Sequence, residues 1–223
     1  MVKKAVLILS GGMDSVTLLY HIIAEGYTVF PISFDYGQKH RKELECAKQI
    51  CKDLQLVHKV VPIPALNDLA PSSQTRKDIE VPEGKYDDDN MKQTVVPNRN
   101  MVMLSLAASY AISINAGVIF YGAHAGDHTI YPDCRETFIR ALDVALSLCD
   151  WTPVRLKAPF VRMSKGQIVK RGIELGVPFE KTWTCYKGEA LSCGVCGSCS
   201  ERLEAFKIAG IADPLKYRKE VVS

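Results

Sequence analysis

Residues 5–15 read Ala5-Val-Leu-Ile-Leu-Ser10-Gly-Gly-Met-Asp-Ser15, and this stretch decides the fold. Five apolar residues in succession are typical of a strand that is buried on both faces of a sheet. The two glycines allow a sharp turn of the main chain, and from Asp14 onward apolar residues recur at helical spacing. A strand that turns directly into a helix is the first half of a β-α-β unit, so the sequence predicts an α/β protein.

The alternation of strands and helices continues along the chain. Apolar runs predict strands at 5–9, 29–34, 57–63, 118–121 and 154–156, and amphipathic stretches predict helices at 14–24, 40–54, 98–115, 136–148 and 164–175. Strands joined by helices form a parallel sheet, so we expect a doubly wound, five-stranded parallel sheet with ligands at the carboxyl ends of its strands. We assign this α/β domain to residues 1–180 and a small C-terminal segment to residues 181–223.

The composition is that of a folded globular protein. The chain has 223 residues, of which 47% are hydrophobic and 24% charged, and these values exclude a disordered or fibrous chain. Its 28 basic and 25 acidic side chains leave a net charge of +3, which does not indicate a nucleic-acid partner.

Two apolar segments resemble membrane or targeting signals. The run at 5–9 is too short for a signal peptide. Residues 101–123 carry no charge and are long enough to span a bilayer, but Ser105, Ser109 and Ser113 recur every fourth residue and Asn115-Ala-Gly117 breaks the segment. We interpret it as a buried helix followed by a strand, and we expect a cytoplasmic protein that has reduced cysteines and no membrane partner.

Residues 64–94 do not fit the alternation. They show little periodicity, contain several prolines and include the acidic run Asp87-Asp-Asp-Asn90. A loop of this length inside a compact domain is usually functional or disordered, so we predict a mobile lid over the site. The acidic run itself is interpreted as a solvated turn.

The turn after the first strand has the features of a phosphate-binding loop. The start of a helix presents unpaired N–H groups and a partial positive charge, which together attract phosphate. Hydroxyl groups add donors, and Asp14 can cap the helix or hold Mg²⁺. The pattern matches neither the Walker nor the Rossmann motif. The predicted phosphate-binding residues are Leu9, Ser10, Gly11, Gly12, Met13, Asp14 and Ser15.

Four cysteines near the end of the chain have the spacing of a metal site. They are Cys185, Cys193, Cys196 and Cys199. Two Cys-x2-Cys steps and a fourth thiol match a closed, tetrahedral, structural Zn²⁺ site, and one ion per chain is expected. An iron–sulfur cluster and metal-free thiols remain open alternatives. Cys134 differs from these four, because it lies at a predicted helix start beside Arg135, where a thiolate is favoured.

Polar residues gather in three further segments at predicted strand ends or helix starts. These segments are 33–40, 96–100 and 121–135. A single His or Asp in such a loop more often serves as a local cap, but a cluster of them favours a site. The candidates are Gln38, Arg99, Asn100, His124, Asp127, Tyr131, Asp133 and Arg135.

The motif Ser10-Gly-Gly-Met-Asp-Ser15 resembles the pyrophosphate loop (PP-loop) of the ATP pyrophosphatases, the superfamily of GMP, NAD and asparagine synthetases and tRNA thiolases. With Phe34-Asp-Tyr-Gly-Gln38, Val96-Pro-Asn-Arg-Asn100, Tyr131-Pro-Asp-Cys-Arg135, Thr182-Trp-Thr-Cys-Tyr186 and the cysteine run, nearly the whole chain is similar to the 7-cyano-7-deazaguanine synthases of the queuosine pathway. That family makes a nitrile from 7-carboxy-7-deazaguanine, ammonia and ATP.

The resemblance implies roles for individual residues. The loop takes pyrophosphate, and Asp14 and Asp127 hold Mg²⁺ between phosphates. Arg99 and Lys165 neutralise phosphate charge, Asp133 accepts the N–H groups of the base, and Tyr131 or Trp183 stacks on its ring. The implied catalytic set is Ser10, Asp14, Ser15, Asp127 and Lys165, with Gln38 and Arg99 at the nucleotide and Asn100, His124, Tyr131, Asp133, Arg135 and Trp183 at the substrate. The family also implies a homodimer.

Two other functions remain open from the residues alone. A PP-loop tRNA thiolase would need a reactive cysteine, which Cys134 supplies, and a basic RNA surface, which the net charge does not indicate. A non-enzymatic, zinc-binding nucleotide module would leave the crowded strand-end loops without a purpose.

Overall fold

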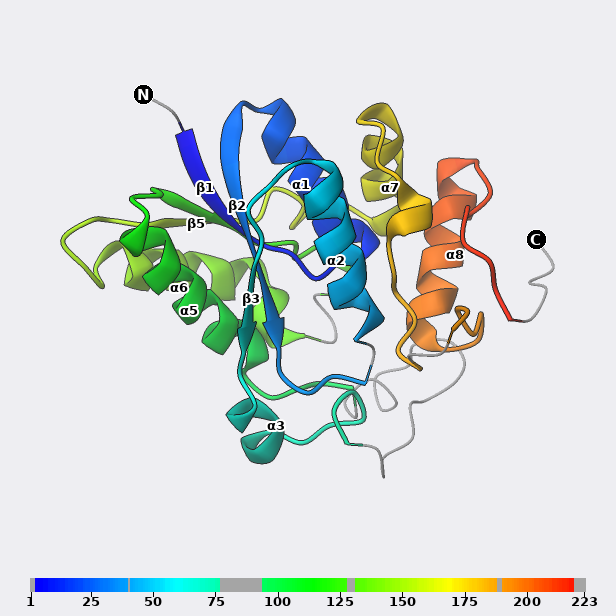
Figure 1. Ribbon diagram of the computed structural model, residues 1–223, viewed down its shortest axis with the longest axis horizontal. Coiled ribbons are helices and arrows are strands. Elements are labelled where there is room, and N and C mark those ends of the chain that lie inside the picture. Colours follow the sequence, from blue (N-terminus) through cyan, green and yellow to red (C-terminus); the bar gives the residue numbers. More distant parts are fainter. Residues whose placement is uncertain (1–2, 40, 77–93, 128–130, 188–189, 219–223) are drawn as a thin grey trace.

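The computed structural model of the protein describes residues 3–39, 41–76, 94–127, 131–187 and 190–218 (Figure 1). Its centre is one five-stranded sheet in the order β3-β2-β1-β4-β5, in which every neighbouring pair is parallel. This arrangement confirms the predicted fold class. The strands are β1 (Lys3–Ile8), β2 (Tyr27–Asp35), β3 (Lys59–Pro62), β4 (Val118–Phe120) and β5 (Arg155–Lys157).

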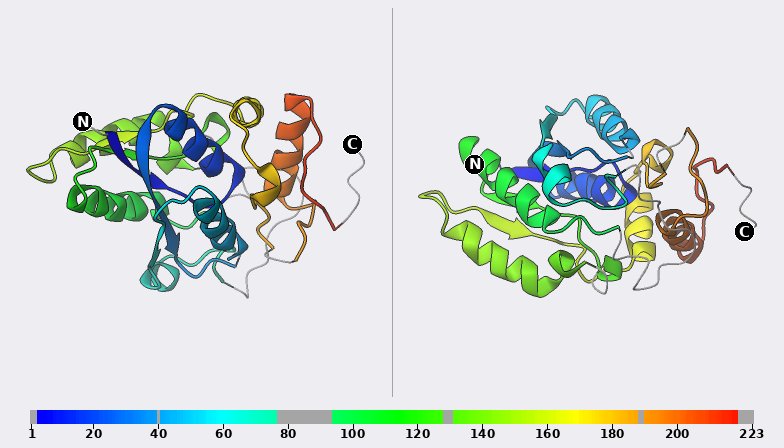
Figure 2. Two further views of the ribbon diagram at one scale, coloured as in Figure 1. Left: turned by 45° about the horizontal axis from the view of Figure 1, so that its top comes forward. Right: turned by 90° about the horizontal axis from the view of Figure 1, so that it is seen from below.

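Helices cover both faces of the sheet (Figure 2). The described helices are α1 (Met13–Ala24), α2 (Lys42–Asp53), α3 (Ala65–Leu69), α5 (Arg99–Ser113), α6 (Glu136–Ser147), α7 (Lys165–Glu174) and α8 (Gly197–Ala209). Because side chains alternate along a strand, Val6 of β1 packs into one hydrophobic cluster with α5 and α6, while Ala5 and Leu7 pack into another with α1, α2, α7 and α8. Short 3-10 turns are η1 (Ala125–Asp127), η2 (Pro132–Cys134) and η3 (Phe179–Lys181).

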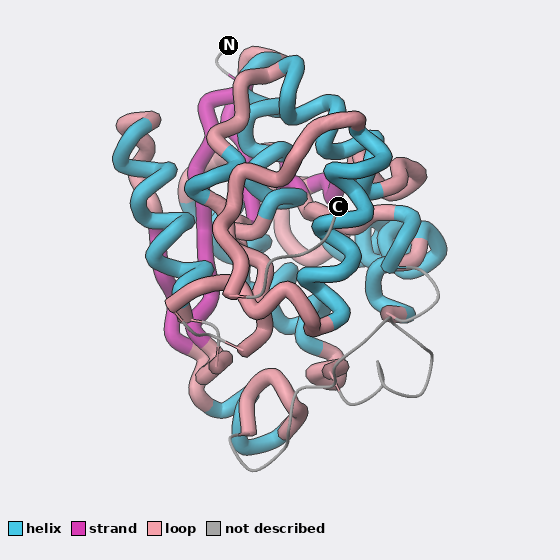
Figure 3. The backbone as a smooth tube through the Cα atoms, turned by 90° about the vertical axis from the view of Figure 1, so that its right-hand side faces the viewer, coloured by secondary structure: helices cyan, strands magenta, loops and turns pink. Residues whose placement is uncertain are grey.

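The C-terminal segment lies against α7 at the side of the sheet. Viewed from that side, its helix and loops stand in front of the strands (Figure 3). Ala205 and Phe206 of α8 belong to the same buried cluster as α1 and α7, and the Phe206 ring meets Phe179 edge to face at 5.1 Å. The segment therefore shares a core with the α/β domain.

The uncharged segment at 101–123 forms a helix and a strand, as predicted. Within α5, the Ser105 and Ser109 hydroxyls donate to the carbonyls of Met101 and Ser105, four residues back. Among the described residues, no helix has the length and apolar character needed to cross a membrane.

Two elements differ from the sequence expectation. Helix α3 lies inside the segment 64–94, and Ser72, Ser73, Gln74 and Thr75 are buried. The described part of the predicted lid is therefore packed, while its remainder, with the acidic run at 87–90, lies outside the described residues. Helix α8 was not predicted, because its sequence shows no apolar periodicity and its first turn, Gly197-Ser-Cys-Ser, has the composition of a metal-binding loop.

Candidate active site

A cavity of about 240 Å³ opens at the carboxyl ends of β1 and β4, where the strand order reverses. This is the position at which doubly wound sheets bind ligands. The predicted site residues in its wall are Leu9, Ser10, Gly12, Met13, Asp14, Ser15, Gln38, Arg99, Asn100, His124, Tyr131 and Lys165. Lining residues that were not predicted include Tyr36, Glu43, Gln74, Tyr121, Thr184, Tyr186 and Ser198.

The loop between β1 and α1 is organised by the Ser15 side chain. Its Oγ accepts hydrogen bonds from the N–H groups of Ser10 at 3.2 Å and Gly11 at 3.3 Å. It also lies 3.0 Å from the Ser10 Oγ, which in turn accepts the N–H of Gly12 at 3.2 Å. These contacts fold the loop over the start of α1, so the helix N-terminus faces the cavity.

Gly11 allows a close approach between this loop and α2. Its φ of +93° is in the left-handed region, and a Cβ placed there would lie 2.1 Å from the Glu43 carbonyl oxygen. Only glycine satisfies both conditions. As a result, the first turn of α2 rests on the loop and places the Glu43 side chain in the cavity wall.

Asp14 is the carboxylate at the centre of the site. Its Oδ2 lies 3.8 Å from His124 Nε2, and the other nitrogen of that ring accepts the Gly126 N–H at 3.1 Å. Its Oδ1 is buried without a hydrogen-bond partner in the described part of the chain. Burial raises the pKa of Asp14 despite the opposing charges of Lys165 and Arg202. An orphaned carboxylate oxygen in a phosphate-binding loop is a suitable ligand for a divalent cation.

Lys165 reaches the cavity from the first turn of α7. A capping box, in which Ser164 and Gln167 exchange hydrogen bonds with the main chain, fixes the start of that helix. The Lys165 ammonium contacts the carboxylate of Glu201 on α8. Glu201 lies in a part of the chain where the sequence predicted no helix. The contact between Glu201 and Lys165 could therefore not be predicted from the sequence.

Arg99 and Gln38 organise the opposite wall. Arg99 donates to Tyr36 Oη at 3.0 Å and to Gln74 Oε1 at 3.1 Å. Gln38 accepts the Tyr36 N–H at 2.9 Å and donates to the Phe34 carbonyl at 3.1 Å. Gln38 thus braces the turn after β2, while Arg99 presents a permanent positive charge to the cavity.

Three predicted substrate residues, Asp133, Arg135 and Trp183, are not part of the cavity wall. The Asp133 carboxylate accepts the N–H of Asn100 at 3.3 Å, in the first turn of α5, and Arg135 is exposed. Trp183 is buried beside the cysteines, where its indole N–H donates to the Cys185 carbonyl at 3.0 Å and Lys42 Nζ lies 4.0 Å from the ring centroid. Asp127 ends η1, and its side chain lies outside the described part of the chain.

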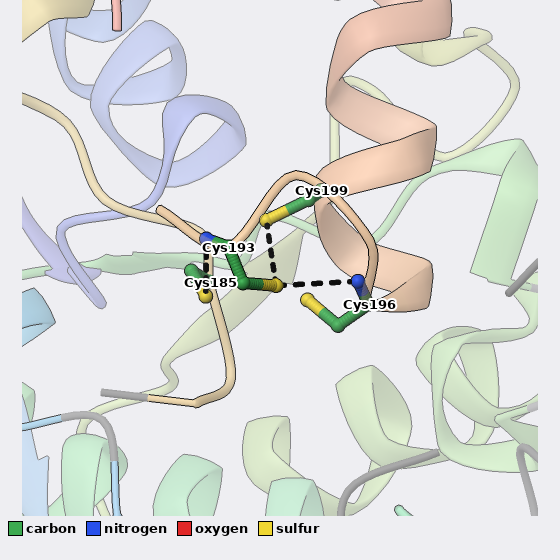
Figure 4. Close-up of side chains that lie close together, drawn as sticks. All are labelled: Cys185, Cys193, Cys196 and Cys199. Atoms are coloured by element: carbon green, nitrogen blue, oxygen red, sulfur yellow. Dashed lines mark hydrogen bonds between the residues drawn. The ribbon is translucent and has the colours of Figure 1, made fainter. Parts of the chain in front are cut away.

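The four C-terminal cysteines form one buried cluster (Figure 4). Their sulfur atoms all lie within 4.8 Å of one another, and those of Cys193 and Cys199 are 3.9 Å apart. A tetrahedral Zn²⁺ with bonds of about 2.3 Å would set its sulfurs about 3.8 Å apart. The residues therefore fit a metal ion in both donor set and spacing.

Hydrogen bonds already prepare these sulfurs for a cation. The N–H groups of Cys193, Val195 and Cys196 point at cluster sulfurs at 3.3–3.4 Å. The thiols of Cys196 and Cys199 hold the pKa of Cys185 well below its usual range, and the contact with Cys185 raises the pKa of Cys196 to about 12. N–H groups directed at sulfur favour thiolates, the form in which cysteine binds a metal ion.

Cys134 also lines the cavity, but it belongs to a different cluster. Its Sγ lies 3.0 Å from Tyr121 Oη and 3.6 Å from Asn100 Nδ2. The thiol is buried at the end of η2. It contacts Tyr121, which follows β4, and Asn100, which lies in the first turn of α5.

The strand order, the Ser-Gly-Gly-x-Asp-Ser loop at the switch point and the buried cysteine cluster together define an α/β protein of the PP-loop class. The fold is similar to that of a solved structure: NMN synthetase from Francisella tularensis superposes with a TM-score of 0.56 at 16% identity, covering 94% of this chain and 78% of that one.

The comparison with family models identifies the family. Residues 4–210 match the model described as "Queuosine biosynthesis protein QueC", and the chain belongs to that family. A 7-cyano-7-deazaguanine synthase from Methanoregula boonei is 63% identical over 96% of this chain and 99% of its own. A second synthase, from Caldicellulosiruptor bescii, is 57% identical over 98% of this chain and 99% of its own.

Proposed function

We propose that the protein converts 7-carboxy-7-deazaguanine and ammonia into 7-cyano-7-deazaguanine at the expense of ATP. The observation that carries the proposal is identity of 63% across nearly the full length of a relative named for this activity. The same similarity favours a synthase over the tRNA thiolase and the binding module. The cavity supports it as well, because a phosphate loop and polar groups from several strand ends line the same cavity.

The reaction needs two activations of a poor leaving group. Transfer of AMP to the substrate carboxylate releases pyrophosphate and creates an electrophile, which ammonia attacks to give the amide and AMP. A second activation, now at the amide oxygen, allows this oxygen to leave as the nitrile forms. Each activation develops negative charge on phosphates, and preorganised donors and cations stabilise such charge.

The residues of the cavity divide this work. The start of α1, with the Ser10 hydroxyl, receives the pyrophosphate. Lys165 and Arg99 neutralise its charge from opposite sides, and Asp14 holds the Mg²⁺ that accompanies ATP. When bound, Mg²⁺ screens the phosphate oxygens. Asn100, Tyr131 and Tyr121 offer hydrogen-bonding and stacking partners to the deazaguanine ring.

The cysteine cluster completes the proposal with one structural zinc ion. All four ligand positions are thiolates, so the metal stabilises the fold around Cys185 and α8 and leaves no open position for chemistry. We also expect a homodimer, as the resemblance to the family implies, and light scattering on the purified protein tests this expectation.

Product analysis tests the function. Protein incubated with 7-carboxy-7-deazaguanine, ammonium, ATP and Mg²⁺ is expected to form the nitrile, detected by mass spectrometry, and the Asp14→Ala variant is expected to form none. Nitrile formation by both proteins would remove Asp14 from the mechanism. Release of AMP and pyrophosphate with another acceptor, without nitrile, would keep the PP-loop chemistry and refute the substrate.

A further inference from the structure

The cysteine segment supplies a charged partner to Lys165, a residue of the cavity wall. Helix α8 begins directly after Cys196, its N-cap, and Cys199 lies in its first turn. Glu201 follows within the same helix, and its carboxylate contacts the Lys165 ammonium. The two side chains come from different parts of the chain, 36 residues apart.

The pair lies at the edge of the cavity, where Lys165 forms part of the wall and Glu201 stands behind it, and both side chains are largely shielded from solvent. The Lys165 side chain is 16% exposed and that of Glu201 is 26% exposed. Lysine has a flexible stem that loses rotamer freedom when its charge is held in one place. An anionic partner that holds the ammonium before the ligand arrives removes that cost from the binding step.

Helix α8 is rigidly mounted, as a positioning role requires. Gly166, the neighbour of Lys165, packs so closely on α8 that a Cβ would lie 2.5 Å from the Ile208 side chain. Arg202, the neighbour of Glu201, is buried and bonded to Asp213, Thr182, Thr184 and the Phe179 carbonyl. With the cysteines at its first turn, α8 is fixed along its length.

We propose that Glu201 is a positioning residue, which holds the Lys165 ammonium beside Asp14 so that it meets the phosphates of ATP and of released pyrophosphate. The cysteine segment is then part of the active site and not only a brace for the C-terminus. This inference rests on the proposed function only in that the loop binds phosphates, since Glu201 is not among the residues that line the cavity.

A double-mutant cycle on pyrophosphate binding tests the inference. Affinity for pyrophosphate with Mg²⁺ is measured by calorimetry for the full chain, Glu201→Gln, Lys165→Met and the double variant. Glu201→Gln is expected to weaken binding about fivefold, the effect of one side chain that must now be ordered on binding. In the Lys165→Met background the same substitution is expected to change nothing, because its effect passes through Lys165.

Controls separate positioning from folding and from general charge. Glu204→Gln removes the same charge from an exposed position on α8 and is expected to bind as the parent does. Metal content and melting temperature establish that each variant is folded. If Glu201→Gln does not fold, Glu201→Asp enters the same cycle, because it keeps the charge on a shorter stem and should give an intermediate affinity.

Two results would overturn the inference. One is an effect of Glu201→Gln that persists in the Lys165→Met background, and the other is binding by Glu201→Gln as tight as in the parent or tighter. The assay uses no deazaguanine. A protein that forms no nitrile but shows the expected cycle would therefore refute the proposed function and leave the role of Glu201 intact.

Discussion

The main-chain N–H of Trp183 donates a hydrogen bond of 3.0 Å to the carbonyl of Gly11. This bond ties the start of the cysteine segment to the phosphate loop and adds to the contacts that the Ser15 hydroxyl makes with the loop. The loop is therefore held by its own helix, by α2 and by the C-terminal segment, and it needs little rearrangement to receive an anion.

Substitution Gly11→Ala is expected to destabilise the protein by about 3 kcal/mol or more, because backbone strain adds to a clash with the Glu43 carbonyl. Urea unfolding measures this loss. The matched control is Gly26→Ala, at a φ of +81° with nothing within 4 Å of the added Cβ, where strain alone costs about 1 kcal/mol. Equal losses at the two positions would contradict the close packing of α2 on the loop.

Substitution Asp14→Asn is expected to abolish nitrile formation and yet to raise stability in Mg²⁺-free buffer at neutral pH. Burial raises the folded-state pKa of Asp14 above 3.8, the ordinary value of an aspartate, so ionisation of this carboxyl destabilises the native state. Below pH 3.8 the two proteins should be equally stable, and the advantage of the variant should grow as the pH rises through the folded pKa.

Melting temperatures measured across this pH range, with and without Mg²⁺, check the prediction. Added Mg²⁺ is expected to stabilise the parent and not Asp14→Asn, since the cation needs the ionised carboxylate. A variant that is less stable than the parent at neutral pH without Mg²⁺ would show that the Asp14 carboxylate is satisfied in some other way.

Substitution Cys199→Ser is expected to remove the bound metal and to lower the melting temperature, because α8 loses the anchor in its first turn. Cys149→Ser, at an exposed thiol, is the control and should keep both. Metal analysis and the visible spectrum are the measurements. One zinc per chain in a colourless parent is expected, and a brown protein that contains iron would contradict the zinc assignment.

Substitution Trp183→Phe is expected to cost about 1–2 kcal/mol of stability, since it leaves the buried Cys185 carbonyl without its donor. The KM for 7-carboxy-7-deazaguanine should not change, because the ring packs beside the cysteines and under Lys42. A selective rise in this KM, without a change in the KM for ATP, would show that Trp183 stacks on the substrate.

The sheet and the phosphate loop could be predicted because each depends on local signals. Apolar runs and glycines define β1 and its turn, and a helix start binds anions wherever it occurs. The four cysteines are recognisable from spacing alone. The ion pair between Lys165 and Glu201 could not be predicted, because Glu201 lies on a helix whose sequence has no apolar periodicity.

Clustering in the sequence was a weaker guide to the site. Within 121–135, His124 and Tyr131 reach the cavity, but the Asp133 carboxylate turns to the start of α5 and Arg135 faces outward. Neighbours in a loop point in different directions, and only tertiary packing decides which of them line the cavity. Tyr36 and Gln74 line the cavity although they are distant from Arg99 in the sequence, and the Arg99 side chain donates a hydrogen bond to each of them.

The central place of β1 in the sheet has a consequence for how the protein folds. Its register partner Val118 in β4 lies more than half the chain away from Ala5. Contacts between distant segments form slowly, because a long loop must close before they stabilise anything. The loop after β1 can therefore acquire its helix early, but it gains the second wall of its cavity only after most of the polypeptide has been synthesised. Nucleotide affinity should consequently appear as one of the last events of folding.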